Sequence, residues 1–417
     1  MPAGGSAGTL AGIACPGTSS CLAGGSYYHS PAGLLPMLAA ESGGRWGSAI
    51  PIALPANAQP KDGSAVIASV SCPAATSCVA VGNYETTAAS LAGLITTGHA
   101  TTWSAGITPA RPANAAAVPD AYLTGVSCTS PAACVAVGGY TNSSHDEEAM
   151  VVTRSGGHWH RAVAIGSPGN ADTNPAAHFS AVSCPKAGYC VAVGGYSTRA
   201  LDDEVMAAIE VRGRWKRAAQ IRMPANAAVQ PVAELYSVSC ASARDCVATG
   251  DYGDDQSRGY PLTVSYSRGR WQRAAGLTTL PAGAERAGQY ATLNGVSCTA
   301  QSCTASGSYR NARGVTLAMV VERAGGQWGR AVRIRLPAGA ASGSAQVAAL
   351  FGIACRAAGR CTAAGSYTGI AGAHSPEAMV VSRSQPAGPD ASSASRRQRE
   401  RQQRVSGVVV GRLDRRP

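Results

Sequence analysis

Cysteines are the residues of this chain whose number and spacing most directly suggest chemistry. The 417 residues contain 14 cysteines in seven pairs, each separated by five or six positions. Facing residues of a β-hairpin lie within disulfide range, so the pairs predict seven disulfides and an oxidising compartment. Reduced cysteines or metal ligands are the alternatives, and no histidine recurs in phase with the pairs as a zinc site would require. The pairs are Cys15/Cys21, Cys72/Cys78, Cys128/Cys134, Cys184/Cys190, Cys240/Cys246, Cys298/Cys303 and Cys355/Cys361.

Other groups that could catalyse a reaction are scattered. His158 and His160 flank Trp159 and would share one strand face, which suits a metal ion or simple exposure at the rim. The sequence has no phosphate-binding loop, no dinucleotide fingerprint and no nucleophile-elbow pattern. We therefore assign no catalytic residue and no metal ligand from the sequence.

Carboxylates cluster in three consecutive segments that we expect to be loops on one face. These carboxylates could bind Ca²⁺, the one cofactor that the sequence suggests, or a basic partner. Alternatively, they are solvated loop residues that serve solubility. The residues of this predicted acidic patch are Asp146, Glu147, Glu148, Asp202, Asp203, Glu204, Asp251, Asp254 and Asp255.

The cysteine pairs recur with a period of about 56 residues, which is the size of one small supersecondary unit. The six tryptophans keep the same period, because each follows the first cysteine of its pair at a nearly constant distance, from Trp46 after Cys15 to Trp328 after Cys298. Two markers with one period indicate seven copies of one structural unit.

One unit is easily read in the third copy. The runs 122–128, 134–140, 149–155 and 158–165 are short, rich in β-forming residues and separated by turn signals. Small residues dominate the first two runs, as the inner strands of converging blades require, and the tryptophan lies on the fourth. We expect that tryptophan to pack between blades and the arginine that follows it, such as Arg161, to reach solvent.

The predicted fold is an all-β, seven-bladed β-propeller of four-stranded antiparallel blades. Residues 1–384 form this single domain, with blades starting near 9, 66, 122, 178, 234, 292 and 349. The last blade lacks its outer strand, because Pro386 stands near the expected tryptophan; segment 405–411 is the one candidate replacement. Residues 385–417 are predicted to be an Arg-rich tail, largely disordered or short-helical.

The net charge of +12 does not indicate a nucleic-acid-binding protein. Residues 396–417 contain eight arginines against Glu400 and Asp414, which supplies half of the excess. No apolar run is long enough for a membrane-spanning helix. No signal peptide is visible, and Met1 falls at a junction between two units. These features predict a fragment, or a mis-started reading frame, of a longer secreted protein.

The strings "SVSC", "CVAVG.Y" and the later "VV…G.W" resemble repeats of secreted or surface-attached actinobacterial proteins, over roughly residues 9–384. More distantly, "VAVGGY" with a later tryptophan is similar to kelch repeats. The resemblance implies a propeller and does not specify an activity.

Two functions remain open from the sequence. The first is an extracellular, monomeric, non-catalytic propeller that binds a protein or glycan with its loop face. The second is a glycan-processing enzyme on the same scaffold, and a truncated fragment is a third interpretation. A binding propeller predicts function spread over variable loops with no unique polar cluster. An enzyme predicts one blade whose central-channel residues break the repeat with convergent acids, tyrosine or histidine, and no blade shows this clearly in sequence.

Overall fold

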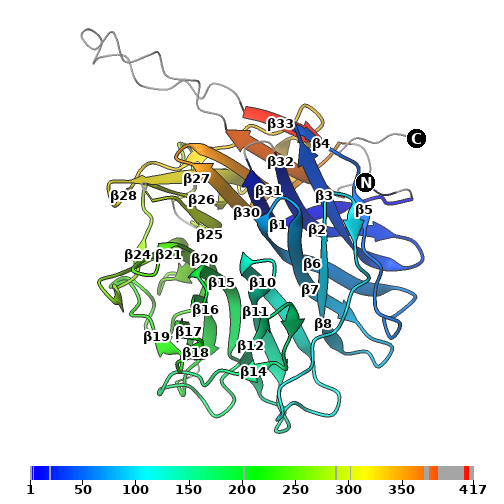
Figure 1. Cartoon of the computed structure of the whole chain (residues 1–417). Helices are drawn as coiled ribbons and strands as arrows, with labels where there is room; N and C mark the ends of the chain where they lie inside the picture. The colour runs from blue at the N-terminus through cyan, green and yellow to red at the C-terminus, as the bar shows by residue number, and fades with distance from the viewer. Residues whose placement is uncertain are drawn as a thin grey trace, which may run out of the picture.

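The computed structural model describes residues 2, 4–17, 20–200, 202–286, 289–300, 302–370, 375–383 and 408–412. In this part of the chain, antiparallel sheets are arranged around a common centre, which is the architecture of a β-propeller (Figure 1). Each repeat contributes three long strands, and in the first six a two-residue strand with the tryptophan follows. The predicted all-β propeller is confirmed.

Each blade is built from consecutive strands of one repeat. Blade 1 contains β1 (Gly8–Gly17), β2 (Ser20–His29), β3 (Gly33–Ser42), β4 (Arg45–Trp46) and β5 (Ile50–Pro51), and blade 2 contains β6 (Gly63–Ala74), β7 (Ser77–Glu85), β8 (Leu91–His99) and β9 (Thr102–Trp103). Blade 3 contains β10 (Ala121–Ser130), β11 (Ala133–Thr141), β12 (Glu147–Ser155), β13 (His158–Trp159) and β14 (Val163–Ala164), and blade 4 contains β15 (His178–Lys186), β16 (Tyr189–Ser197), β17 (Asp203–Val211), β18 (Arg214–Trp215) and β19 (Ala219–Gln220). Blade 5 contains β20 (Ala233–Ser242), β21 (Asp245–Gly253), β22 (Gly259–Ser267), β23 (Arg270–Trp271) and β24 (Ala275–Gly276), and blade 6 contains β25 (Ala291–Cys298), β26 (Ser302–Arg310), β27 (Thr316–Ala324), β28 (Gln327–Trp328) and β29 (Val332–Arg333). A 3₁₀ turn, η1 (Gly343–Ala345), precedes blade 7, which contains β30 (Ala348–Ala357), β31 (Arg360–Thr368), β32 (Pro376–Arg383) and β33 (Val408–Arg412).

The register explains why cysteine and tryptophan share one period. In blade 3, Cys128 faces Cys134, Cys134 faces Arg154, and Arg154 faces Trp159. Directly facing residues of antiparallel strands point to the same side of the sheet, so the disulfide and the indole lie in one row across the blade. All seven cysteine pairs form disulfides, with Cα–Cα distances of 3.9 to 4.1 Å.

The two cysteines of each pair differ in burial. The sequence predicted equivalent positions for them, one on either side of a hairpin loop, and gave no sign of this difference. In the structure the first cysteine is only partly buried, whereas the second lies in the core and packs in the apolar cluster at a blade junction. The disulfides therefore belong to the framework of the ring and not to a surface that could bind a ligand. The seven buried cysteines, each 1 to 9% exposed, are Cys21, Cys78, Cys134, Cys190, Cys246, Cys303 and Cys361.

The blades are held together by apolar packing at every junction of the ring. Among the described residues, the buried apolar side chains form seven clusters, and each combines two neighbouring blades. One cluster joins Leu10 and Met37 of blade 1 to Val380 of blade 7, which closes the ring. The tryptophans are partly buried against these clusters, as expected from their phase in the repeat.

A hydrogen-bond ladder adds to this packing and explains the serine of "VSC". The backbone N–H of Cys184 donates to Ser127 Oγ of the preceding blade at 3.0 Å. The same bond recurs at the junctions from blade 2 to blade 7, at 2.9 to 3.0 Å. Blades 1 and 7 have Ala14 and Ala354 in place of the serine. Both junctions of blade 1 therefore lack the acceptor.

The connectors between blades are fixed by two further recurring contacts. The buried tyrosine of "VGxY" donates to an asparagine of the preceding connector, as from Tyr84 to Asn57 Oδ1 at 2.9 Å. The arginine that follows the tryptophan in blades 3 to 6 was expected simply to reach solvent. Arg161 does lie at the surface, but its guanidinium also donates to the carbonyl of Arg111, 50 residues earlier, at 2.9 Å. Arg217, Arg273 and Arg330 make the equivalent bond.

The last blade has the three long strands of the repeat, as predicted. Strand β33, which overlaps segment 405–411, pairs antiparallel with β32 at the edge where the other blades have their tryptophan strand. The described part of the tail is thus the candidate replacement strand, although most of the tail was expected to be disordered or short-helical. Residues 384–407, including Pro386, lie outside the described residues. In the described part of the chain, no helix is long and apolar enough to cross a membrane.

Candidate functional site on blades 3 to 5

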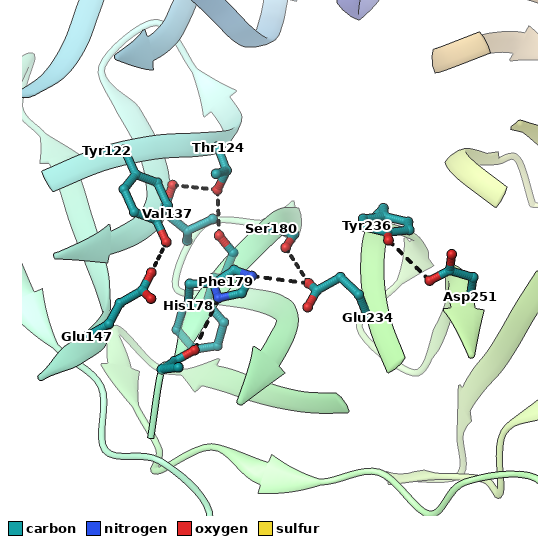
Figure 2. A network of polar contacts seen from close by, with 11 residues as sticks. Tyr122, Thr124, Val137, Glu147, His178, Phe179, Ser180, Glu234, Tyr236 and Asp251 are labelled. Carbon is teal, nitrogen blue, oxygen red and sulfur yellow. Dashed lines mark hydrogen bonds and ion pairs between the residues drawn. The ribbon is translucent and has the colours of Figure 1, made fainter. Parts of the chain in front are cut away.

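The position six residues before the first cysteine of each pair differs sharply between blades. It lies near the start of the innermost strand, on the face opposite the disulfide hairpins. Three consecutive blades place large polar side chains there, namely Tyr122, His178 and Glu234, whereas the other four have Thr9, Val66, Thr292 and Ala349. The propeller arrangement brings the three polar residues to one side of its centre (Figure 2).

His178 and Glu234 line a hollow of about 690 Å³ over blades 3 to 6, and Tyr122 is joined to it by its hydrogen bond to the lining residue Glu147. We call the group formed by Tyr122, Glu147, His178, Glu234, Tyr236 and Asp251 the Tyr–His–Glu site. Tyr236 and Tyr290 also line the hollow, and they are 37% and 49% exposed, so aromatic surface is available to a bound molecule.

Polar contacts link the side chains within blades 3 and 5 and between blades 4 and 5 (Figure 2). Ser180 Oγ donates to Glu234 Oε1 at 2.6 Å, and His178 Nε2 lies 3.5 Å from the same oxygen. The Tyr122 hydroxyl donates to Glu147 Oε1, and the Tyr236 hydroxyl donates to Asp251 Oδ1 at 3.1 Å. Each titratable side chain of the site therefore has a defined partner.

Two glycines make room for this arrangement. A Cβ atom at Gly195 would lie 2.1 Å from Glu234 Oε2, and one at Gly139 would lie 2.6 Å from the Tyr122 hydroxyl. Most other blades carry a side chain at the equivalent position, including Asn83 in blade 2. Glycine is thus required at Gly139 and Gly195 by the neighbouring polar group and not by the backbone of the repeat.

The surroundings shift the pKa values of the site in different directions. Burial lowers the pKa of His178, but the hydrogen bond and charge of Glu234 outweigh it and raise the pKa to about 9. Burial, opposed by the Tyr236 hydroxyl and assisted by the charge of Glu234, raises the pKa of Asp251 to about 6. Burial and the adjacent carboxylates hold the pKa values of Tyr122 and Tyr236 well above their usual range. At neutral pH the histidine is therefore cationic, the two phenols are neutral, and Asp251 is mostly ionised, with its titration midpoint just below neutral pH.

The nine carboxylates of the predicted acidic patch do not form one cluster. Glu147, Asp203, Asp251 and Asp254 line the hollow. Glu148 and Glu204 instead accept hydrogen bonds from the buried tyrosines Tyr140 and Tyr196 of their own blades. The remaining three, Asp146, Asp202 and Asp255, lie in loops, where Asp255 accepts from the backbone N–H of Val229.

The histidines flanking Trp159 do not converge with other ligand types. His160 pairs with Ser155 Oγ at 2.6 Å, and both His158 and His160 are exposed. Among the described residues, no group of three or more His, Cys, Asp or Glu side chains is arranged to hold a metal ion.

Of the residues in the Tyr–His–Glu site, only Glu147 and Asp251 were predicted from the sequence, as members of the acidic patch. One signal was available: an alignment of the seven units on their first cysteine shows Tyr122, His178 and Glu234 in a column that is otherwise small or apolar. The three residues break the repeat with tyrosine, histidine and an acid, but they come from three blades and not from the single blade that the enzyme hypothesis predicted.

Comparison with known proteins agrees with the fold and gives no family. No protein-family model and no curated protein matches the chain. Among solved structures, it is similar to a PL25 ulvan lyase, with 9% identity, a TM-score of 0.55, and coverage of 91% of this chain and 92% of that one. The Hadza microbial sialidase Hz136 has 10% identity and a TM-score of 0.46, with 79% of this chain and 66% of that chain covered. The six-bladed Aleuria aurantia lectin has 9% identity and a TM-score of 0.39, with 75% and 89% covered. At these identities the likeness concerns the fold alone.

Proposed function

We propose that the protein is an extracellular propeller that binds a glycan in the hollow at the Tyr–His–Glu site. One observation carries the proposal: three consecutive repeats have Tyr122, His178 and Glu234 in place of a small or apolar residue, and of these His178 and Glu234 line one hollow while Tyr122 donates to its lining residue Glu147. A sugar offers hydroxyl groups to such donors and acceptors and an apolar ring face to exposed tyrosines.

The disulfides and the sequence resemblance support an extracellular role. Seven disulfides fit an oxidising compartment. The resemblance to secreted actinobacterial repeat proteins points the same way. The ulvan lyase with the similar fold acts on a polysaccharide, as its name states, so this architecture can accommodate a glycan chain. We expect the protein to act as a monomer.

A second candidate function, acid–base chemistry on the bound glycan, is favoured by Asp251. A group that transfers protons works best with a pKa near the operating pH, and the pKa of Asp251 is about 6. The neutral Tyr236 hydroxyl and the Glu234 carboxylate beside it supply a donor and an acceptor. This arrangement would suit cleavage of a glycosidic bond.

A glycan array followed by calorimetry tests binding directly. We expect the native protein to bind at least one oligosaccharide class, and Glu234→Gln to weaken that binding at least tenfold with an unchanged circular dichroism spectrum. Val66→Thr is the matched control, because it changes the same repeat position in blade 2 to the residue of blades 1 and 6. Absence of any glycan ligand, or full binding by both Glu234→Gln and Tyr236→Ala, would overturn the proposal.

Catalysis is tested on the glycan that binds. If the protein is an enzyme, new chain ends accumulate with time, and Asp251→Asn abolishes their formation while binding stays within about threefold of native. The native rate should show a pH limb near the Asp251 pKa. Binding without any new chain ends would leave the non-catalytic function as the answer.

A further inference from the structure

The hollow at the Tyr–His–Glu site has an excess of negative charge. Five carboxylates line it, and the two cationic side chains there are both engaged in ion pairs. His178 lies 3.5 Å from Glu234, and Arg258 lies 2.6 Å from Asp254. Glu147, Asp203 and Asp251 have no ion pair of their own in the described lining of the hollow, although the charge of Glu147 also acts on His178.

The three remaining carboxylates have only neutral hydroxyl donors among the hydrogen bonds of the described residues. Tyr122 donates to Glu147, Ser197 donates to Asp203 at 2.9 Å, and Tyr236 donates to Asp251. A hydroxyl satisfies one lone pair but leaves the negative charge in place. The raised pKa of Asp251, to which the charge of Glu234 contributes, agrees with this excess.

The proposal that a molecule binds here does not rest on this charge. It rests on the hollow itself and on the exposed ring faces of Tyr236 and Tyr290 at its border. The charge instead decides which class of molecule the hollow accepts. A uronic-acid chain would bring carboxylates next to Glu147 and Asp251 without a free arginine or lysine to receive them, which is unfavourable at close range.

We propose that the glycan bound at this site carries free amino groups, so that its ammonium groups compensate Glu147, Asp203 and Asp251. This inference rests on the proposed function and names its ligand class. An ammonium group gains from the carboxylates and from the electron-rich face of a tyrosine, and the sugar ring fills a hollow bounded by aromatic surface. A lysine-rich peptide would satisfy the charges but has no rigid ring to lie against Tyr236 and Tyr290, so we favour the amino sugar.

Calorimetry with three oligosaccharides of equal length separates the classes. The probes are a fully deacetylated glucosamine oligomer, its N-acetylated counterpart, and a galacturonic acid oligomer, measured below neutral pH, where the amines are charged. We expect the glucosamine oligomer to bind at least tenfold more tightly than the N-acetylated one, the galacturonic acid oligomer to bind most weakly, and added salt to reduce the difference.

Charge-neutral variants identify the residues responsible. Asp203→Asn and Asp251→Asn should each reduce, several-fold, the ratio of the affinity for the glucosamine oligomer to the affinity for the N-acetylated one. Asp245→Asn is the control, because this exposed carboxylate lies at the disulfide hairpin on the opposite face. Loss of preference in the control but not in the site variants would contradict the assignment.

The remaining outcomes separate this inference from the proposed function. If the N-acetylated or galacturonic acid oligomer binds as tightly as the glucosamine oligomer, the amino-sugar inference is wrong and glycan binding stands. If no oligosaccharide of the array or of this series binds, both fail. If a lysine-rich peptide binds the hollow more tightly than the glucosamine oligomer, the ligand is a basic protein segment instead.

Discussion

Blades 3 to 5 and blades 1, 2, 6 and 7 share one backbone plan but differ at the inner end of the first strand. In the latter group this position holds a small or apolar residue, and the buried side chains serve packing. In blades 3 to 5 the same position carries Tyr122, His178 and Glu234, which contact partners on neighbouring strands and blades. The disulfides, the serine hydrogen bonds and the apolar clusters hold the backbone of the blades. A few side chains can therefore differ between blades without loss of the fold, and such positions are available for binding.

The largest expected effect comes from removing one element of that framework. Replacing both Cys298 and Cys303 by alanine in blade 6 should lower the free energy of unfolding by about 2 kcal/mol, because the unfolded chain gains loop entropy. Chemical denaturation measures the loss, and glycan binding below the unfolding transition should stay unchanged. A loss of binding in the folded variant would contradict the separation of framework and site.

A reciprocal pair of substitutions tests the site itself. Gly195→Ser introduces a side chain where a Cβ atom alone would lie 2.1 Å from Glu234 Oε2, so the carboxylate must move. We expect about a tenfold loss of glycan affinity, equivalent to about 1.4 kcal/mol. The converse change Asn83→Gly, at the same repeat position in blade 2, should leave affinity unchanged. Equal affinities for all three proteins would show that the position of Glu234 is unimportant.

The serine ladder gives the next smaller effect. Ser127→Ala removes the acceptor of the Cys184 N–H and should destabilise the protein by about 1 kcal/mol. Ala14→Ser in blade 1 offers the missing acceptor to the Cys72 N–H and should stabilise by at most a similar amount. Thermal unfolding of the two variants compares them directly, and a neutral Ser127→Ala would remove the ladder from the account of stability.

The smallest expected effect is the pH dependence of stability. The pKa of His178 is raised from its ordinary value of 6.5 to about 9, so its ion pair stabilises the fold fully below pH 6.5 and is lost as the pH rises through 9. The His178 side chain is 28% exposed, and this limits the contribution to about 1 kcal/mol or less. His178→Gln should flatten the unfolding free energy over this range, as measured by denaturation at each pH. An unchanged slope in the variant would rule out this pair as its source.

The sequence alone determined the architecture, because a propeller is built from local units. Alternating β runs, turn glycines and the shared phase of Cys and Trp are all encoded within one repeat. The disulfide pairing is also local, since each hairpin closes on itself. The acidic loops were visible as well, although their division into hollow-lining residues such as Glu147 and tyrosine-bound residues such as Glu148 was not. The two are neighbours in the chain, and they point to opposite faces of one strand.

The location of the candidate site depends on the tertiary structure. Tyr122, His178 and Glu234 are each one repeat apart in sequence, and only the stacking of successive blades around one centre places His178 and Glu234 in the lining of one hollow, with Tyr122 bonded to its lining residue Glu147. Burial of the second cysteine of each pair, such as Cys190, also depends on the neighbouring blade that covers it. The pKa of His178 depends on burial and on the charge of Glu234 from the next blade, which no local pattern contains, whereas Asp251 faces Glu234 within its own blade. Closure of the ring likewise required the packing of Leu10 against blade 7, because residues near opposite ends of the chain meet there.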